Sequence, residues 1–314
     1  MKDKLSIVLP AYNESKMICK TRAKLAEVLE KAGIEYELIF VDDGSKDDTW
    51  AAIRTASETY PGITGIHFSR NFGKEAAIFA GLSQALGNVV AVMDCDLQHP
   101  PETLVQMYRL WKQGYEVIDG VKADRGKEGV LYKVSAGTFY RIMSKATGVD
   151  MKNASDFKMM DKKVVDTLLK MPERNTFFRA LASWTGYRAT AVEFDVQERK
   201  EGESKWSLMS LIKYAFTNIS LFTAFPLQFV TFSGMFVLLV GIILGIQTIA
   251  KYLSGTAVEG FTTVIVLILF IGSIIMISLG LIGYYLAKMY EEIKHRPKFI
   301  ISETSGVTTV DSKI

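Results

Sequence analysis

Two long stretches near the end of the chain contain no charged residue and no histidine. They cover residues 227–250 and 261–287, and each is longer than the ~20 residues that a helix needs to cross about 30 Å of hydrocarbon. A surface helix of a soluble domain would carry charged side chains on its outer face. We therefore expect two transmembrane helices, so that the chain must fold in two different solvents.

Basic residues lie on both outer flanks of this pair of stretches. Lys288, Lys294, Arg296 and Lys298 follow the second stretch, whereas the connection at residues 251–260 holds one Lys and one Glu. By the positive-inside rule, both flanks are cytoplasmic and the connection lies outside. We therefore expect a multi-pass protein of the plasma membrane, with its N-terminal domain and both termini in the cytoplasm.

The flanks differ in character. Residues 205–226 place apolar side chains at helical spacing, which predicts an amphipathic juxtamembrane helix at the membrane surface. Residues 288–314 read as a cytoplasmic basic tail, and we expect it to be polar and disordered beyond Ser302. Residues 1–204 remain for a cytoplasmic domain.

Short apolar runs alternate with longer amphipathic runs in residues 1–204. This pattern predicts an α/β fold with a doubly wound, mostly parallel sheet and helices on both faces. The expected strands are residues 5–9, 36–41, 63–68, 89–93, 116–118, 156–160 and 187–195. The expected helices are residues 15–32, 49–60, 74–86, 102–113, 130–147, 162–170 and 175–185, with a mobile loop at residues 121–129.

Composition excludes several classes of protein. A net charge of +3 in 314 residues, with no basic stripe, argues against nucleic-acid binding. Cys19 and Cys95 are far apart and lack a partner motif, which argues against a disulfide framework or a zinc site and fits a reducing compartment. The N-terminus lacks the apolar length and the cleavage site of a signal peptide.

Two carboxylates follow the fourth expected strand, which is the place where α/β sheets bind ligands. Asp94 and Asp96 stand at its end, and the amide oxygen of Gln98 is close in sequence. These oxygens could hold Mg²⁺ or Mn²⁺ and so neutralise a departing diphosphate. The alternatives are a solvated Asp-x-Asp turn and a haloacid-type phosphatase, whose first Asp is a nucleophile; the residues after Asp96 do not match the phosphatase pattern.

Polar groups also follow two other expected strands. Asp43, beside the turn at Gly44, could accept hydrogen bonds from a ribose or a base. Tyr12 and Glu14 could stack on and bind a pyrimidine. Because carboxyl ends of parallel strands meet at one edge, the three ends predict one pocket rather than three capped turns.

Five motifs occur together in this chain. They are Pro10-Ala11-Tyr12-Asn13-Glu14, Val41-Asp42-Asp43-Gly44-Ser45, Asn71-Phe72-Gly73-Lys74, Asp94-Cys95-Asp96-Leu97-Gln98-His99-Pro100-Pro101-Glu102 and Arg199-x-x-Gly202-x-Ser204-Lys205. Together they closely resemble family 2 glycosyltransferases of the GT-A fold, and in particular the polyprenyl-phosphate branch. Bactoprenol glucosyltransferases are similar, and dolichol-phosphate mannose synthases are similar more distantly. Two departures are Cys95, where Ala is more usual, and Glu201, where the mannose synthases carry Arg; the second favours the bacterial branch.

The resemblance implies a role for each matching residue. Asp94, Asp96 and Asp156 would be catalytic, and Asp94, Asp96 and Gln98 would hold the metal. The nucleotide sugar would be bound by Pro10, Tyr12, Glu14, Val41, Asp43, Cys95 and Gln98. The lipid phosphate and the diphosphate would face Arg199, Ser204 and Lys205, helped by Lys122 and Arg125 of the charge-rich loop.

The implied reaction moves one sugar, glucose or another hexose, from a nucleotide sugar, expected to be UDP-linked, to undecaprenyl phosphate with inversion. The lipid phosphate is already anionic at neutral pH, so a strong general base is not required. Transfer of mannose, N-acetylglucosamine or an aminoarabinose derivative remains an alternative, as does a non-enzymatic membrane scaffold. Glycines in the two apolar stretches, together with the resemblance, suggest a homo-oligomer, with a tetramer as one option.

Overall fold

A computed structural model describes residues 3–123, 155–171, 173, 177–195, 225–254 and 260–306. The chain divides into two compact units. One contains residues 1–207 together with 297–314, and the other contains residues 208–296. The first unit is the sheet domain and the second holds the apolar helices.

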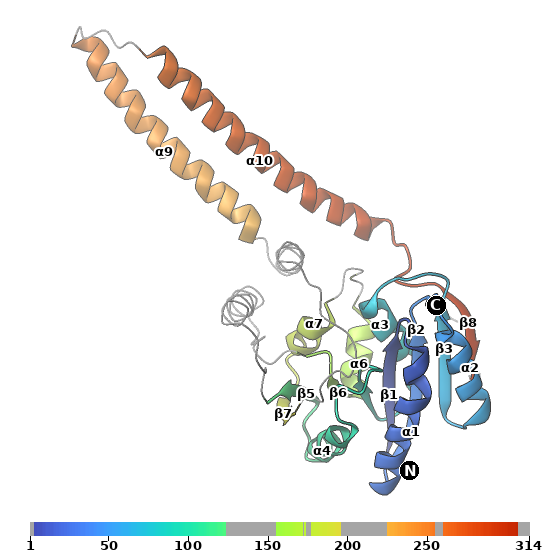
Figure 1. Ribbon diagram of the computed structural model, residues 1–314. Coiled ribbons are helices and arrows are strands. Elements are labelled where there is room, and N and C mark those ends of the chain that lie inside the picture. Colours follow the sequence, from blue (N-terminus) through green and yellow to red (C-terminus); the bar gives the residue numbers. More distant parts are fainter. Residues whose placement is uncertain are drawn as a thin grey trace. The chain divides into compact units, whose positions relative to one another are not determined.

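The sheet domain is built on an eight-stranded sheet within the described residues, with the order β7-β5-β6-β4-β1-β2-β3-β8 (Figure 1). Strands β1, β2, β3 and β4 are mutually parallel, β6 and β8 are antiparallel to their neighbours, and β5 is parallel to β7. The strands are β1 Lys4–Ala11, β2 Glu35–Asp42, β3 Ile63–Phe68, β4 Val89–Val92, β5 Val117–Lys122, β6 Lys158–Asp161, β7 Ala189–Phe194 and β8 Ile301–Ser305.

Helices cover both faces of this sheet. Helix α1 packs against α2 and α4, whereas α3 packs against α6, which contacts α7. Leu5, Ile7 and Leu9 of β1 belong to the core under the first group, and Val8 faces α3, where Gly81 leaves room for its side chain. The helices are α1 Ser15–Lys31, α2 Thr49–Thr59, α3 Lys74–Gln84, α4 Pro101–Lys112, α6 Lys162–Leu169 and α7 Phe178–Trp184.

The expected α/β architecture with a mostly parallel sheet is confirmed for the described part of the sheet domain, and the sheet also includes strands that run antiparallel to their neighbours. Strand β6 runs antiparallel between β4 and β5. Its Lys158 is fully buried and forms an ion pair with Asp119 of β5. The pairing gives a buried ammonium its counterion, without which burial would be very costly. The helix expected at residues 130–147 lies outside the described residues.

We expected disorder beyond Ser302, but residues 303–305 belong to the edge strand β8, and residues 307–314 lie outside the described residues. β8 pairs with β3, and Trp50 Nε1 donates to Glu303 Oε2 at 2.8 Å. Just before the strand, the ring of Phe299 stacks on buried Phe68 with centroids 5.2 Å apart. A polar sequence can be ordered here because the edge of β3 supplies unpaired backbone groups.

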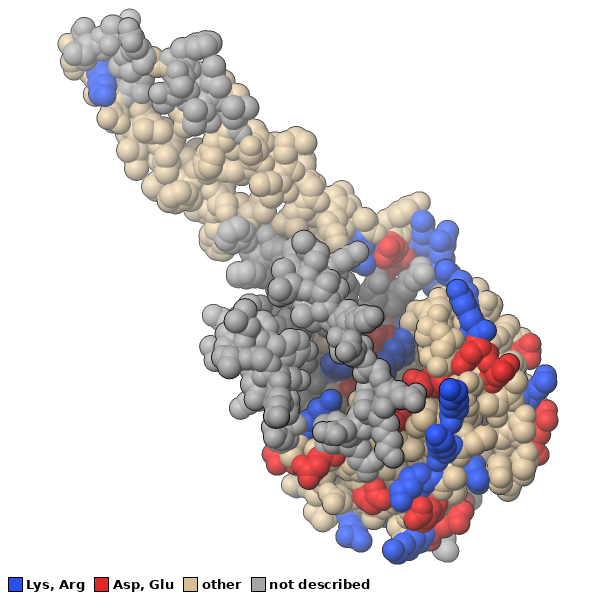
Figure 2. Space-filling view, viewed as in Figure 1, with Lys and Arg blue, Asp and Glu red and all other residues tan. Residues whose placement is uncertain are grey.

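The described residues of the second unit form two helices, α9 Phe225–Leu253 and α10 Phe261–Ile293. Within them, Val230–Lys251 and Phe270–Ile293 have mean hydropathies of 2.2 and 1.9 and are long and apolar enough to cross a membrane. Charged side chains are scarce along most of both helices, whereas Lys and Arg alternate with Asp and Glu over the coloured part of the sheet domain that Figure 2 shows. Residues 205–224 of the expected amphipathic helix lie outside the described residues. Residues 225 and 226, the last two of that expected helix, instead begin α9. A proline such as Pro226 is tolerated in the first turn of a helix, where its missing N–H has no partner to lose.

Candidate functional site

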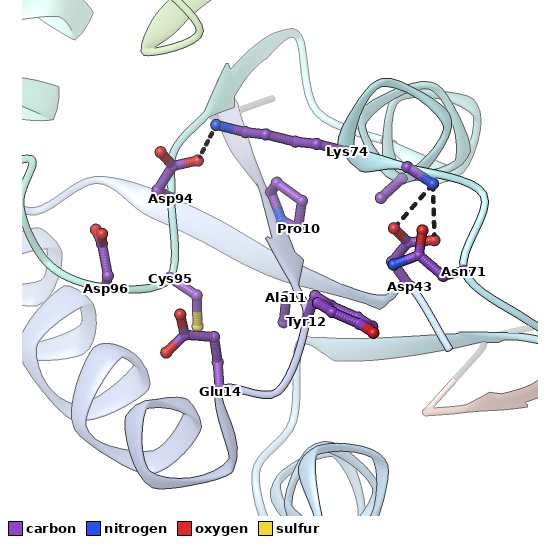
Figure 3. A pocket seen from close by; sticks show the side chains of 12 residues that line it. Pro10, Ala11, Tyr12, Glu14, Asp43, Asn71, Lys74, Asp94, Cys95 and Asp96 are labelled. Atoms are coloured by element: carbon purple, nitrogen blue, oxygen red, sulfur yellow. Dashed lines mark hydrogen bonds and ion pairs between the residues drawn. The ribbon is translucent and has the colours of Figure 1, made fainter. Parts of the chain in front are cut away.

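A cavity of about 320 Å³ lies at the carboxyl ends of β1, β2 and β4, beside the start of α3. Asp43 and Asn71 stand at one end of it, Asp94 and Asp96 stand at the other, and Tyr12 lies between them (Figure 3). The lining residues are Pro10, Ala11, Tyr12, Glu14, Asp43, Asn71, Gly73, Lys74, Ala77, Asp94, Cys95 and Asp96. The three strand ends therefore do form one pocket.

The loop after β1 is tied to the loop after β2. The backbone N–H of Asn13 donates to Ser45 Oγ at 2.8 Å, and the Asn13 side chain accepts from the N–H of Lys46 at 2.9 Å. Asn13 has a φ of 55°, a conformation that Asn tolerates better than most residues. These bonds fix the backbone that carries Tyr12, and Tyr12 is 43% exposed.

Asp43 anchors the segment that leads into α3. Its carboxylate accepts from the N–H of Phe72 at 2.7 Å and from the N–H of Gly73 at 2.9 Å. Burial raises the pKa of Asp43, and these two N–H groups oppose that shift. Gly44 has a φ of +65°, and a Cβ there would come within 2.4 Å of the Arg70 backbone, so only glycine allows this close approach.

The loop after β4 turns sharply at Leu97, which has a φ of 58°. Asp96 Oδ1 accepts from the backbone N–H of Gln98 at 3.1 Å, which holds that carboxylate close to the turn. Thr21 Oγ1 of α1 donates to the Cys95 carbonyl at 2.6 Å. Burial raises the pKa of the Cys95 thiol to about 12, so the thiol that lines the pocket stays uncharged at neutral pH.

The donor atoms at this lip fit a hard divalent cation. Two carboxylates, Asp94 and Asp96, line the same end of the cavity, and Mg²⁺ or Mn²⁺ is commonly held by one or two carboxylates, with substrate phosphates and waters completing the shell. Among the described residues, no group of three His, Cys, Asp or Glu side chains could hold a metal without such help.

A cation from α3 connects this lip to a second acidic residue. Lys74 Nζ lies 2.6 Å from Asp94 Oδ1 and 3.0 Å from Asp156 Oδ2. Burial by itself would lower the pKa of Lys74, but these two carboxylates outweigh burial and raise it. The reach of Lys74 from α3 across the pocket to Asp94 is visible in Figure 3.

Asp156 is paired on its other side with Arg179 of α7, whose Nε and Nη2 lie 2.6 Å and 2.7 Å from its two carboxylate oxygens. Burial favours the protonated acid, but Arg179 and Lys74 outweigh it and hold the pKa of Asp156 well below its usual range. Beside this cluster, burial and the charge of Asp156 raise the pKa of Glu75 to about 7, and Glu75 accepts from the N–H of Phe178 at 2.8 Å.

Seven of the fifteen expected site residues line the cavity, four have places elsewhere, and four lie outside the described residues. Pro10, Tyr12, Glu14, Asp43, Asp94, Cys95 and Asp96 line the cavity together. Asp156 reaches it through Lys74, Val41 is buried within β2, and the half-buried Gln98 and exposed Lys122 are not among the lining residues. Arg125, Arg199, Ser204 and Lys205 lie outside the described residues, so their expected phosphate contacts stay predictions.

Sequence reasoning missed the roles of Lys74, Glu75 and Arg179. Lys74 is the last residue of the motif Asn71-Phe72-Gly73-Lys74 and begins an expected helix. Its positive charge in that motif could have marked it as a candidate site residue. Nothing in the sequence around Arg179 pairs it with Asp156, because Arg179 comes 23 positions later, after a strand and a helix.

Comparisons with known proteins agree with this geometry. The model of the family described as Glycosyl transferase family 2 matches residues 6–169. The chain belongs to glycosyl transferase family 2. YkcC, an uncharacterised glycosyltransferase of Bacillus subtilis, is 38% identical over 304 residues, covering 96% of this chain and 94% of that protein. The bactoprenol glucosyl transferase of Shigella phage SfV is 36% identical over 300 residues, covering 95% of this chain and 98% of that protein.

Among solved structures, mannosyl-3-phosphoglycerate synthase from Rubrobacter xylanophilus aligns with a TM-score of 0.49 and 15% identity, covering 70% of this chain and 73% of that chain. The family assignment confirms that this protein is a glycosyltransferase with a GT-A domain, and it excludes the haloacid-type phosphatase and the scaffold weighed from the sequence. In a family 2 glycosyltransferase, the cavity at the ends of β1, β2 and β4 is the candidate active site.

Proposed function

We propose that this glycosyltransferase moves one hexose from a nucleotide sugar to undecaprenyl phosphate at the cytoplasmic leaflet. The preferred sugar is glucose and the preferred donor is UDP-linked. Transfer inverts the anomeric configuration, and the product is a polyprenyl-monophosphate sugar for envelope glycosylation. The observation that carries the proposal is the single cavity that joins Tyr12 and Asp43 to Asp94 and Asp96 in a chain with two membrane-length apolar helices. A relative that aligns with 95% of this chain bears the name bactoprenol glucosyl transferase, and its alignment spans both parts.

The two ends of the cavity suit the two ends of a nucleotide sugar. The exposed ring of Tyr12 offers a stacking surface for the base, and the Asp43 end offers acceptors for ribose or base hydroxyl and N–H groups. Asp94 and Asp96 face the diphosphate end, where Mg²⁺ or Mn²⁺ would neutralise charge on the leaving nucleoside diphosphate. The order of groups along the pocket thus matches the order of groups along the donor.

The acceptor needs little activation, because a phosphate monoester carries its own negative charge at neutral pH. Asp156 stays ionised between Arg179 and Lys74 and holds these cations in place, so we assign it a positioning role and not that of a base. Lys122, Arg125, Arg199, Ser204 and Lys205 remain our candidates for offsetting the repulsion between the two anions.

Chain connectivity supports a hairpin of two membrane helices. The chain leaves the sheet domain before α9 and returns to it after α10, where β8 joins the same sheet. Both outer ends of the helix pair therefore belong on one side of the bilayer, and the positive-inside rule makes that side cytoplasmic. Gly234, Gly241 and Gly272 leave open space where a side chain would stand, which suits close helix packing in a homo-oligomer, and a tetramer is one form to look for.

The test uses the purified full-length protein in nanodiscs, undecaprenyl phosphate and a panel of labelled donors. We expect a labelled, chloroform-soluble product with UDP-glucose, or with another member of the panel, that depends on a divalent cation. GDP-mannose, UDP-N-acetylglucosamine and a UDP-aminoarabinose derivative test the alternatives. The absence of any lipid-linked sugar, from every donor and with either cation, would overturn the proposal.

A further inference from the structure

Lys74 occupies an unusual position for a lysine, because it bridges two carboxylates that belong to different parts of the site. One is Asp94 at the diphosphate end of the cavity, 2.6 Å away, and the other is Asp156, 3.0 Å away. The Lys74 side chain is 41% exposed and lines the cavity itself, so its ammonium group can meet a ligand there.

The two carboxylates do not depend on Lys74 equally. Asp156 has a second partner in Arg179, which binds both of its oxygens, and its side chain is only 9% exposed. Asp94 is 33% exposed and faces the cavity. If a positive ion binds Asp94, its charge repels the nearby ammonium, so the cation and Lys74 compete for the same carboxylate. Lys74 then retains Asp156 as its anchor.

We propose that Lys74 is the counterion that a divalent cation must displace from Asp94, and that it then binds a phosphate oxygen of the nucleoside diphosphate while it stays anchored on Asp156. This inference rests on the proposed function, because it takes the donor to be a nucleotide sugar. It gives Lys74 two opposite effects: it weakens cation binding in the absence of nucleotide and strengthens nucleotide binding once the cation is present.

The test measures two binding constants for Lys74→Met, neither of which needs the lipid acceptor. Binding of Mn²⁺ alone is followed by the electron paramagnetic resonance signal of the free ion, and binding of UDP is measured by calorimetry at saturating Mn²⁺. We expect Lys74→Met to bind Mn²⁺ about three- to tenfold more tightly, because the competing charge is gone. We expect it to bind UDP about tenfold more weakly, because a charged hydrogen bond is lost.

Three control variants test the charge of Lys74, its position and the carboxylate for which it competes. Lys74→Arg keeps the charge and should leave UDP affinity within about threefold of the parent. Lys20→Met removes a charge from the exposed side of α1 and should change neither constant by more than about twofold. Asp94→Asn should abolish the tightening of Mn²⁺ binding in the Lys74→Met background, because the contested carboxylate is then absent.

The signs of the two changes decide the outcome. General damage to the pocket would weaken both ligands, so Mn²⁺ binding that is unchanged or weaker in Lys74→Met overturns the counterion role. Unchanged UDP affinity overturns the phosphate contact. If the parent enzyme binds Mn²⁺ and UDP but transfers no sugar to undecaprenyl phosphate, the proposed function fails while the binding comparison still judges Lys74.

Discussion

Arg179 binds Asp156 through two nitrogens, with Nε and Nη2 at 2.6 Å and 2.7 Å from the two carboxylate oxygens. This bidentate geometry is the strongest form of side-chain ion pair, and here it joins helix α7 to the strand that begins at Lys158. Because Lys74 binds the same carboxylate, Asp156 compensates two cations at once. Asp156, to which the family resemblance assigns a catalytic role, therefore also holds Arg179 and Lys74 in place beside the pocket.

Asp156→Asn should therefore destabilise the sheet domain. The change leaves Arg179 and Lys74 without their shared anion, and we expect a loss of about 2 kcal/mol in the free energy of unfolding, after allowing for the exposure of both cations. Urea unfolding in detergent measures it. The matched control is Asp166→Asn, whose ion pair with Lys162 is exposed on α6 and should contribute under about 0.5 kcal/mol. Equal losses of unfolding free energy in Asp156→Asn and Asp166→Asn would contradict the role of Asp156 as the shared anion of Arg179 and Lys74.

Asp96→Asn should abolish sugar transfer and leave the protein folded and membrane-bound. The side chain keeps its size, but it loses the charge needed to hold a divalent cation at the end of the cavity that Asp94 and Asp96 line. Transfer assays with and without EDTA, alongside a thermal unfolding scan, measure both parts. Full activity of the parent enzyme in the presence of the chelator would refute the metal role of Asp94 and Asp96.

Glu75→Gln should change how stability depends on pH. The pKa of Glu75 is raised from 4.5 to about 7 in the folded protein, first by burial and then by the charge of Asp156. Between these two values the unfolded chain has lost the proton and the folded chain keeps it, so stability falls as pH rises from about 4.5 to above 7. Glutamine stays neutral and can still accept from the N–H of Phe178.

We therefore expect Glu75→Gln to match the parent protein near pH 4.5 and to be more stable by about 3 kcal/mol at pH 8. Unfolding midpoints measured across this range test the prediction. Parallel pH profiles for the two proteins would mean that Glu75 ionises normally in the folded state.

Gly306→Ala should loosen the edge strand β8. Gly306 has a φ of +72°, and a Cβ there would lie 2.1 Å from the carbonyl oxygen of Ile63. Gly33→Ala is the matched control, because its φ is +67° and no atom lies within 4 Å of the added carbon. Both changes carry the backbone cost of about 1 kcal/mol, but only Gly306→Ala adds a clash.

The readout is amide hydrogen exchange in β3, which pairs with β8 from Gly65 to Phe68. We expect faster exchange there in Gly306→Ala and parent-like exchange in Gly33→Ala. If β3 is protected equally in both variants, β8 does not depend on the turn at Gly306.

Arg199→Ala should chiefly weaken use of the lipid phosphate. This follows from the motif that ends at Lys205, because a guanidinium there would bind the acceptor anion. We expect the KM for undecaprenyl phosphate to rise about tenfold, with a smaller change in the KM for the donor. Steady-state kinetics with each substrate varied in turn tests this prediction. An unchanged KM for undecaprenyl phosphate would contradict the proposed contact between Arg199 and the lipid phosphate.

Much of the site was readable from the sequence because it depends on local patterns. Asp94 and Asp96 follow an apolar strand, and Tyr12 and Asp43 follow two others, so strand periodicity alone places them at one edge. Lys74, Glu75 and Arg179 were not assigned, because their roles depend on which helix lies beside which strand end. The order at β8 was missed for a similar reason, since a polar tail is ordered only where an unpaired edge accepts it.

The sequence by itself determined that this chain has an α/β domain with acidic strand ends and two apolar helices, since hydrophobic periodicity and stretch length are properties of neighbouring residues. Only the tertiary structure decided that Lys74 joins Asp94 to Asp156 and that β8 closes the edge of β3. Both are contacts between segments far apart along the chain. Their energies depend on burial and distance, which exist only after folding.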